Sequence, residues 1–228
     1  MLVMMREIGL WGDSIGKGVV YDEQKGRYVI LRENCVNLLS KKLNCPIANH
    51  AVMGATAAQG MERMREDFLH EGGLAVIEFG GNDCDMPWKE ISEAPEKEYR
   101  PKATIEEFMK SLEMLVSRVR SAGMEAMLVA PPPLDAEKYF GWVSRGLNAQ
   151  AILSFLGDVQ HIARWQAGYA EAVRKVAART GSRLLDLSGA FLGAERIGDC
   201  YCLDGIHPNA QGHQLLAQEA ERRLGLAL

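Results

Sequence analysis

Short apolar runs alternate along the chain with longer amphipathic stretches. The apolar runs predict strands at residues 7–11, 47–49, 75–79, 124–130 and 183–187. The amphipathic stretches predict helices at residues 31–43, 104–122, 161–181 and 209–223. Strands that alternate with helices are typical of an α/β domain with a mainly parallel sheet. Right-handed crossovers should place helices on both faces of that sheet.

Two of the predicted helices carry recognisable local signals. The first has one apolar face, formed by Leu31, Cys35, Leu38, Leu39 and Leu43. The second opens with Thr104 and has Glu107 three residues later, which is a capping box, and Gly123 follows its end.

Two segments do not fit the simple alternation. Residues 19–30 predict a small β-hairpin that turns at Gln24-Lys25-Gly26. Residues 134–158 are long for a loop and contain four aromatic residues, namely Tyr139, Phe140, Trp142 and Phe155. Segments of this length are usually lids, binding loops or small helical insertions. The aromatic side chains either form a substrate platform or anchor the insertion to the core.

Composition and net charge indicate which kinds of protein this chain can be. The chain has 228 residues, of which 47% are hydrophobic and 25% are charged, and this suits one globular domain over residues 1–228. The formal net charge of −4 argues against a nucleic-acid partner, which usually requires a basic patch. The oligomeric state stays open.

The cysteines and the N-terminus bear on the compartment. Five cysteines are an odd number without framework spacing, and Cys200-Tyr201-Cys202 is too tight for an ordinary disulfide and lacks a second pair for zinc. Residues 1–6 have no basic leader, and no stretch approaches the ~20 apolar residues of a membrane span. We therefore expect a reduced, cytoplasmic protein with no membrane span.

Polar clusters follow the predicted strands. Residues 12–14, 49–54 and 80–83 come after the first three strands, and residues 204–208 precede the last helix. In doubly wound sheets, functional groups collect at the carboxyl ends of the strands. We expect these four clusters to meet there.

The clusters resemble the motif blocks of the SGNH hydrolase superfamily (GDSL-like lipases, acylhydrolases and esterases). Ser14, Gly54 and Asn82 match the serine, glycine and asparagine blocks in chain order, and Asp204 and His207 match the last block. The resemblance extends from residue 12 to residue 208. It implies a three-layer α/β/α flavodoxin-like fold with a five-stranded, mainly parallel sheet in the order 2-1-3-4-5. It also implies a hydrolase of esters or thioesters.

Two positions depart from the family pattern. Ile15 follows the serine where the family's namesake residue is leucine, and Ala51 stands where the second block often has glycine. The second is a mild departure.

The same residues support this chemistry on physical grounds. A serine hydroxyl becomes a good nucleophile when a positioned base takes its proton, and His207 is the candidate base for Ser14. Asp204 would fix the tautomer of His207 and stabilise the imidazolium. The Ser14 N–H, the Gly54 N–H and the Asn82 amide are candidate oxyanion donors. We expect Ser14 to face the surface from its turn, and we expect no cofactor and no metal.

Other polar residues are expected to have structural roles. We expect surface or packing positions for the remaining histidines, which are His50, His70, His161 and His213. His50 is the best placed of them, because it lies within the second cluster. Asp13 and Asp83 should brace loops by hydrogen bonding, and Cys84 should be a small buried hydrophobe.

Alternatives remain open. Each motif alone is a plausible turn or helix start, but their joint occurrence in this order favours the hydrolase. The substrate class stays open among carbohydrate O-acetyl esters, short acyl esters, lysophospholipids and acyl thioesters. The rivals are a catalytically idle binding module and a flavodoxin-like protein that binds a phosphate-bearing cofactor near Gly12, Gly16 and Gly18.

Overall fold

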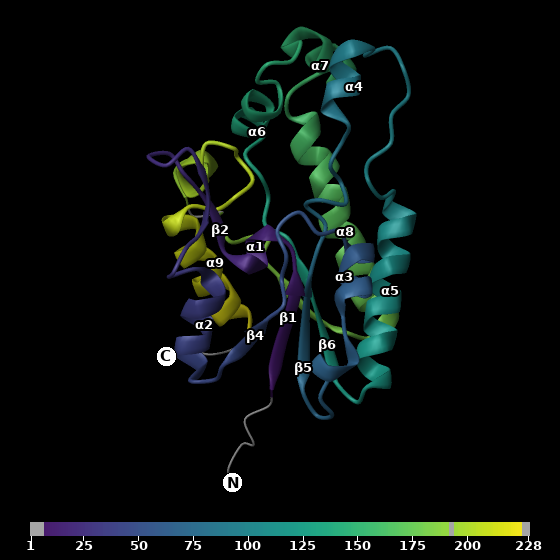
Figure 1. The fold of residues 1–228 in the computed structure, drawn as a ribbon, viewed down its shortest axis with the longest axis vertical. Helices are drawn as coiled ribbons and strands as arrows, with labels where there is room; N and C mark the ends of the chain where they lie inside the picture. The colour runs from purple at the N-terminus through teal and green to yellow at the C-terminus, as the bar shows by residue number, and fades with distance from the viewer. Residues whose placement is uncertain (1–6, 192–193, 225–228) are drawn as a thin grey trace.

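A five-stranded parallel sheet forms the centre of the computed structural model, which describes residues 7–191 and 194–224 (Figure 1). The strands are β1 (Ile8–Gly12), β4 (Ile47–Asn49), β5 (Leu74–Glu78), β6 (Glu125–Ala130) and β7 (Arg183–Asp186). They lie in the order β4-β1-β5-β6-β7, and each neighbouring pair is parallel. Numbered within the sheet, this is the predicted order 2-1-3-4-5, so the predicted fold class is confirmed.

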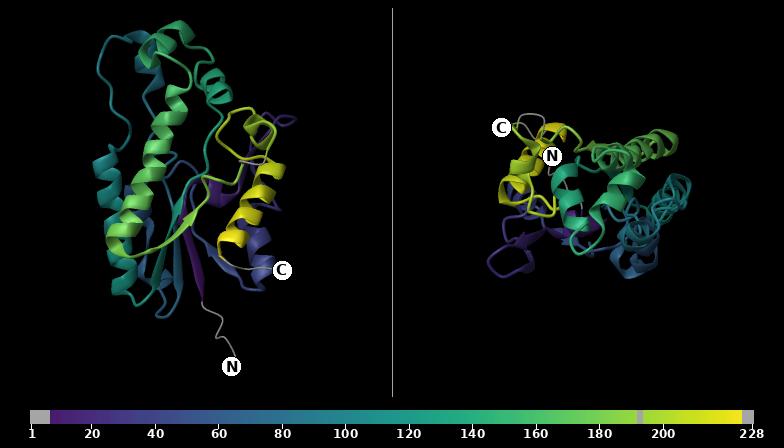
Figure 2. Two further views of the ribbon diagram at one scale, coloured as in Figure 1. Left: turned by 180° about the vertical axis from the view of Figure 1, so that it is seen from behind. Right: turned by 90° about the horizontal axis from the view of Figure 1, so that it is seen from above.

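Helices cover both faces of the sheet, as the two views in Figure 2 show. The helices on one face are α3 (Ala57–Arg63), α5 (Ile105–Ser121) and α8 (His161–Thr180), and those on the other are α2 (Cys35–Leu43) and α9 (Ala210–Arg223). Phe79 and Leu112 are buried in the first layer, and Leu10 and Leu216 are buried in the second. Apolar burial on both faces is what a parallel sheet with helical crossovers requires.

Helix boundaries follow their capping residues. The predicted start at Leu31 was wrong: α2 begins at Cys35, because the side chain of Asn34 accepts a hydrogen bond from the Asn37 N–H. The predicted capping box at Thr104 and Glu107 is present at the start of α5. Helix α3 was not among the predicted helices.

The predicted hairpin is also present. It consists of β2 (Val19–Asp22) and β3 (Arg27–Ile30), which pair antiparallel. Its Tyr21 ring lies 4.9 Å from the ring of Trp142, measured between centroids. The hairpin thus packs against the segment 134–158.

That segment is a small helical insertion, the third of the predicted possibilities. It contains α6 (Ala136–Val143) and α7 (Ala149–Leu156), which lie with α4 (Trp88–Glu93) beyond the carboxyl ends of the strands (Figure 1). It shares a small core with α4 and α8, which consists of Ile91, Ala136, Ile152, Leu156 and Ile162. Three short elements complete the fold: α1 (Ser14–Lys17) and the 3₁₀ helices Glu66–Phe68 and Ile197–Cys200.

Two further expectations concern membrane-spanning helices and the cysteines. Within residues 7–191 and 194–224, no helix combines the length and apolar character needed to cross a bilayer. Cys35, Cys84, Cys200 and Cys202 are buried free thiols. The N-terminal run 1–6 lies outside the described residues.

Candidate active site

Ser14 is the first residue of α1, a single helical turn that directly follows β1. Asp13 caps this turn, because its Oδ1 accepts a hydrogen bond of 2.9 Å from the Ile15 N–H. The expectation that Ser14 faces the surface was wrong, since the residue is only 8% exposed. It lines a cavity to which α4, α6, α7 and α8 also contribute residues. Among the described residues, the Ser14 N–H has no hydrogen-bond partner.

The buried carboxyl of Glu78, which was not predicted from the sequence, holds the Ser14 turn by hydrogen bonds. Glu78, the last residue of β5, accepts hydrogen bonds at Oε2 from the Asp13 N–H at 3.2 Å and from the Gly16 N–H at 3.1 Å. Burial, together with the neighbouring Asp13 carboxyl, raises the pKa of Glu78 well above its ordinary value. The signal in the sequence was a glutamate inside the apolar run 75–79.

Two glycines make room for this carboxyl. A Cβ atom at Gly12 would lie 2.6 Å from Glu78 Oε2, and one at Gly16 would lie 3.0 Å from it. Two of the three glycines that suggested a phosphate site, Gly12 and Gly16, therefore lie against the chain's own carboxyl. A phosphate at this turn would meet like charge or compete for the same N–H groups, which argues against the phosphate-binding alternative.

Asp204 and His207 form a direct pair. Asp204 Oδ2 lies 2.6 Å from His207 Nδ1, and Asp204 Oδ1 accepts hydrogen bonds from the backbone N–H groups of Ile206 and His207. Both side chains are buried. Burial opposes the charge on Asp204, but the hydrogen bonds from His207 outweigh it and lower the pKa of Asp204. The carboxylate therefore stays ionised beside the imidazole.

The turn that holds this pair depends on Gly205. Its φ of +72° lies in the left-handed region, and a Cβ atom there would come within 2.6 Å of the Asp135 carbonyl oxygen and the Tyr139 nitrogen. The Asp135 N–H also donates to the Gly205 carbonyl at 2.9 Å. The start of α6 thus packs directly onto the turn that carries His207.

The second polar cluster, residues 49–54, follows β4 and continues its hydrogen bonding to the end of β1. The Val52 N–H donates to the Gly12 carbonyl at 3.0 Å, and Asn49 Nδ2 donates to the Gly16 carbonyl at 2.8 Å. Gly54 follows with a φ of +81°, and a Cβ atom there would meet no heavy atom within 4 Å. Within the described part of the chain its N–H has no acceptor. Gly54 is exposed, so its N–H is available to an acceptor from outside the chain.

Asn82 is tied to both neighbouring loops. Its Nδ2 donates to Asp13 Oδ2 and to the Ala55 carbonyl, each at 3.2 Å. Burial raises the pKa of Asp13 to about 6, against the opposing hydrogen bond from Ile15. The two bonds fix the plane of the Asn82 amide between the Ser14 turn and the Gly54 loop.

The expected loop braces are present. The carboxylate oxygens of Asp83 accept hydrogen bonds from the Ala57 N–H at 3.0 and 3.2 Å, and Asp13 caps α1 as described. Cys84 is buried, and its thiol donates to the Gly81 carbonyl at 3.3 Å. Cys84 also lines the cavity beside Ser14.

Three of the other histidines have packing positions or partners outside the cavity, and His161 lines it. His50 stacks between Trp11 and Phe68, with ring centroids 4.9 and 4.3 Å away. His213 is fully buried; burial lowers its pKa to about 4, and its Nδ1 accepts from the Cys35 N–H. His70 is exposed near Glu7, and His161 lies at the cavity wall beside Trp165.

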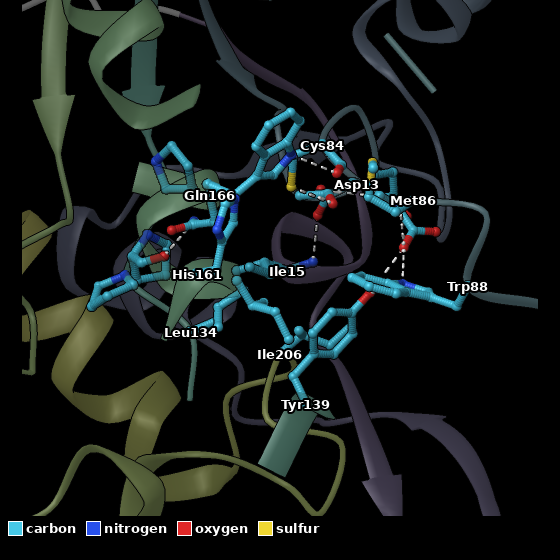
Figure 3. Close-up of a pocket in the computed structure, with 18 of the residues that line it drawn as sticks. Asp13, Ile15, Cys84, Met86, Trp88, Leu134, Tyr139, His161, Gln166 and Ile206 are labelled. Carbon is cyan, nitrogen blue, oxygen red and sulfur yellow. Dashed lines mark hydrogen bonds between the residues drawn. The ribbon is translucent and has the colours of Figure 1, made fainter. Parts of the chain in front are cut away.

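The structure thus gathers the predicted residues at one edge of the sheet. Ser14 and Asn82 line the same cavity, which Figure 3 shows from within. His207 Nε2 is buried and has no hydrogen-bond partner among the described residues. The Ser14 hydroxyl is not hydrogen bonded to it, although catalytic bonds often tighten only when substrate binds. An imidazole nitrogen without a partner, an ionised aspartate on its other nitrogen and two unused backbone N–H groups provide the parts of acyl-transfer chemistry.

Known proteins resemble this chain across most of its length. Among solved structures, the α/β hydrolase LAE5 from the metagenome of Lake Arreo, Spain, is 21% identical with a TM-score of 0.68, covering 96% of this chain and 95% of its own. A lipase/acylhydrolase from Enterococcus faecalis is 20% identical with a TM-score of 0.65, over 96% and 95% of the two chains. An acetylxylan esterase from Geobacillus stearothermophilus is 18% identical with a TM-score of 0.64, over 96% and 94%.

These three likenesses show the shared fold. No curated protein matches the chain. The model of the GDSL-like Lipase/Acylhydrolase family matches residues 10–215, a range that contains all five predicted site residues. The chain is therefore a hydrolase of ester bonds and belongs to the GDSL-like Lipase/Acylhydrolase family.

Proposed function

We propose that the protein is a serine esterase that works through an acyl-Ser14 intermediate. The observation that carries this proposal is the Asp204–His207 pair, 2.6 Å apart, whose Nε2 has no partner among the described residues at the edge of the sheet where Ser14 lies. An aspartate that accepts from Nδ1 fixes the tautomer in which Nε2 is a free base.

The reaction would proceed in two halves. His207 Nε2 takes the proton of the Ser14 hydroxyl as its oxygen attacks the carbonyl carbon of the ester. The tetrahedral intermediate collapses when His207 donates that proton to the leaving alkoxide, which departs as an alcohol. Water then attacks the acyl-enzyme by the same proton transfers and releases the carboxylic acid and the free serine.

Three donors would stabilise the negative oxygen of each tetrahedral intermediate. The N–H groups of Ser14 and Gly54 have no acceptor within the described residues and can donate without breaking a bond. The Asn82 amide would redirect one of its two 3.2 Å hydrogen bonds to the oxyanion. Preorganised donors of this kind contribute roughly 3–4 kcal/mol each to the transition state.

A fluorophosphonate probe tests the proposal, because it labels only an activated serine. We expect covalent labelling of Ser14, identified by peptide mass, together with hydrolysis of 4-nitrophenyl esters. Ser14→Ala should lose both. Ser117→Ala, on the exposed side of α5, is a matched control that should lose neither. If Ser14→Ala in a clean preparation still hydrolyses the esters, Ser14 is not the nucleophile. If, in addition, the probe does not label the wild-type protein, the result favours the alternative that this site is catalytically idle.

A further inference from the structure

We propose that the cavity beside Ser14 binds the acyl chain of the ester, and that the preferred acyl group is apolar with about six to ten carbons. This inference rests on the proposed function, because it assumes that Ser14 is the nucleophile. The cavity has a volume of about 220 Å³ and extends from Ser14 and Asn82 into the helical insertion. Figure 3 shows Met86, Trp88 and Leu134 converging on it.

The polar groups in the cavity wall are largely engaged within the protein. Trp88 Nε1 and the Tyr139 hydroxyl both donate to Asp85 Oδ1, at 3.0 and 2.8 Å. Trp165 Nε1 donates to the Cys84 carbonyl at 3.1 Å. The remaining surface is mostly aliphatic and aromatic. A sugar placed here would lose more hydration than the few polar lining groups could replace, whereas a hydrocarbon chain would gain from burial.

The wall is held in place before any ligand binds. Lys102 Nζ lies 2.9 Å from Asp85 Oδ2, the carboxylate oxygen that Trp88 and Tyr139 do not use. The Asp85 side chain therefore connects α4, α6 and the segment before α5. Gln166 Nε2 donates to the Pro132 carbonyl at 2.9 Å on the opposite wall. A preformed apolar cavity selects for chain length, because its depth does not adjust to the ligand.

The volume sets the size of the group. An apolar cavity of roughly 150 Å³ accommodates benzene, which has six carbons. In proportion, 220 Å³ accommodates about nine carbons, and the range of about six to ten allows for the shape of a flexible chain.

The geometry assigns the acyl chain rather than the alcohol to this cavity. The leaving alcohol must lie next to His207, which donates its proton. The His207 ring packs on Tyr28, with centroids 5.0 Å apart, and Tyr28 lines a different, open groove with Val52 and Met53. His207 is absent from the described lining of the cavity beside Ser14, whereas Asn82 is part of it. The alcohol therefore leaves along the groove, and the acyl chain occupies the cavity.

A series of 4-nitrophenyl esters tests this inference, because the alcohol stays constant while the acyl chain varies from acetate through butyrate, hexanoate, octanoate and decanoate to myristate. Each buried methylene should raise kcat/KM by about two- to fourfold. We expect octanoate to exceed acetate by roughly 100-fold or more, and myristate to fall below octanoate. Equal or better hydrolysis of acetate would overturn the inference.

Two variants check that the cavity causes the preference. Leu134→Trp fills the cavity and should lower the octanoate-to-acetate ratio of kcat/KM at least tenfold, whereas Phe155→Ala should move the optimum to longer chains. Met114→Trp, on the exposed face of α5, adds the same indole outside the cavity and should leave the ratio unchanged. An unchanged ratio in both cavity variants would refute the assignment.

The fluorophosphonate probe separates the two possible failures. If Ser14 is labelled but acetate is the best substrate, the inference about the acyl chain is wrong and the proposed function stands. If Ser14 is not labelled and no ester is hydrolysed, the proposed function fails and the inference fails with it.

Discussion

The buried carboxyl of Glu78 supports the turn that presents Ser14, and replacing it gives a quantitative test of the site's construction. In Glu78→Ala, the N–H groups of Asp13 and Gly16 lose their common acceptor. A buried donor without a partner costs roughly 1–3 kcal/mol, so the two together cost about 2–6 kcal/mol. That is a large share of the ~5–15 kcal/mol by which proteins of this kind are stable. We also expect kcat to fall, because the turn that carries the Ser14 hydroxyl loosens.

Glu78→Gln separates the hydrogen bonds from the charge. Its amide oxygen can still accept from the Asp13 and Gly16 N–H groups, so folding and kcat should largely recover. The raised pKa of Glu78 means that the folded state holds its proton more tightly than the unfolded state does. Its contribution to stability is then fully present below the ordinary pKa of 4.5 and is lost as pH rises toward the folded value. Glu78→Gln should remove this loss.

The assay is chemical denaturation at pH 5, 7 and 9, with kcat measured on the same samples. Glu62→Ala, on the exposed side of α3, is the control for removing a glutamate. We expect the stability of Glu78→Gln relative to wild type to increase with pH. The reasoning is refuted if Glu78→Ala costs no more than Glu62→Ala, or if the wild type and Glu78→Gln change in parallel across the pH series.

Further expectations concern the rest of the site. Asn82→Ala should lower kcat by roughly 10²–10³ with little change in KM, and Asn82→Asp should be at least as harmful; a lower Tm with an unchanged kcat would make Asn82 structural instead. Asp204→Asn should lower kcat by roughly 10⁴, because His207 would adopt the wrong tautomer, and retained activity would contradict that role. Asp13→Asn should gain stability relative to wild type between pH 4 and 7, since the stabilising proton on Asp13 is lost as pH rises through about 6; denaturation at several pH values measures this. EDTA should leave kcat unchanged, because no step of the proposed mechanism uses a metal, and a loss restored by one added metal would refute it.

The sheet was predictable because its determinants are local. Each strand is a short apolar run followed by a turn, and the order of the strands followed from the family resemblance that the turn motifs carry. The capping box at Thr104 and Glu107 marked the start of α5. The same signal at Thr56 and Gln59 marks α3, so this helix was readable from the sequence although it was not predicted.

The features that could not be predicted depend on distant contacts. Glu78 and Gly16 are 62 residues apart, and no pattern in the sequence states that one carboxyl fills the space left by two glycines. Likewise, Tyr28 packs on His207 only because the β2–β3 hairpin lies against the loop that precedes α9. The cavity beside Ser14 also arises from tertiary structure, since most of its lining residues come from much later in the chain.

The architecture places the proposed chemistry and the proposed selectivity on different parts of the chain. Ser14 and Asn82 follow adjacent strands, so the sheet itself holds the nucleophile and an oxyanion donor in register. The end of the proposed acyl cavity away from the sheet is lined by residues of α4, α6, α7 and the start of α8, and the rest by loops that follow the strands. Substitutions in those helices can change the volume of the cavity without altering the strand ends. Gly205 is the exception, because α6 packs against it: changes near Asp135 should affect the orientation of His207 and therefore kcat for every ester, not the preference among them.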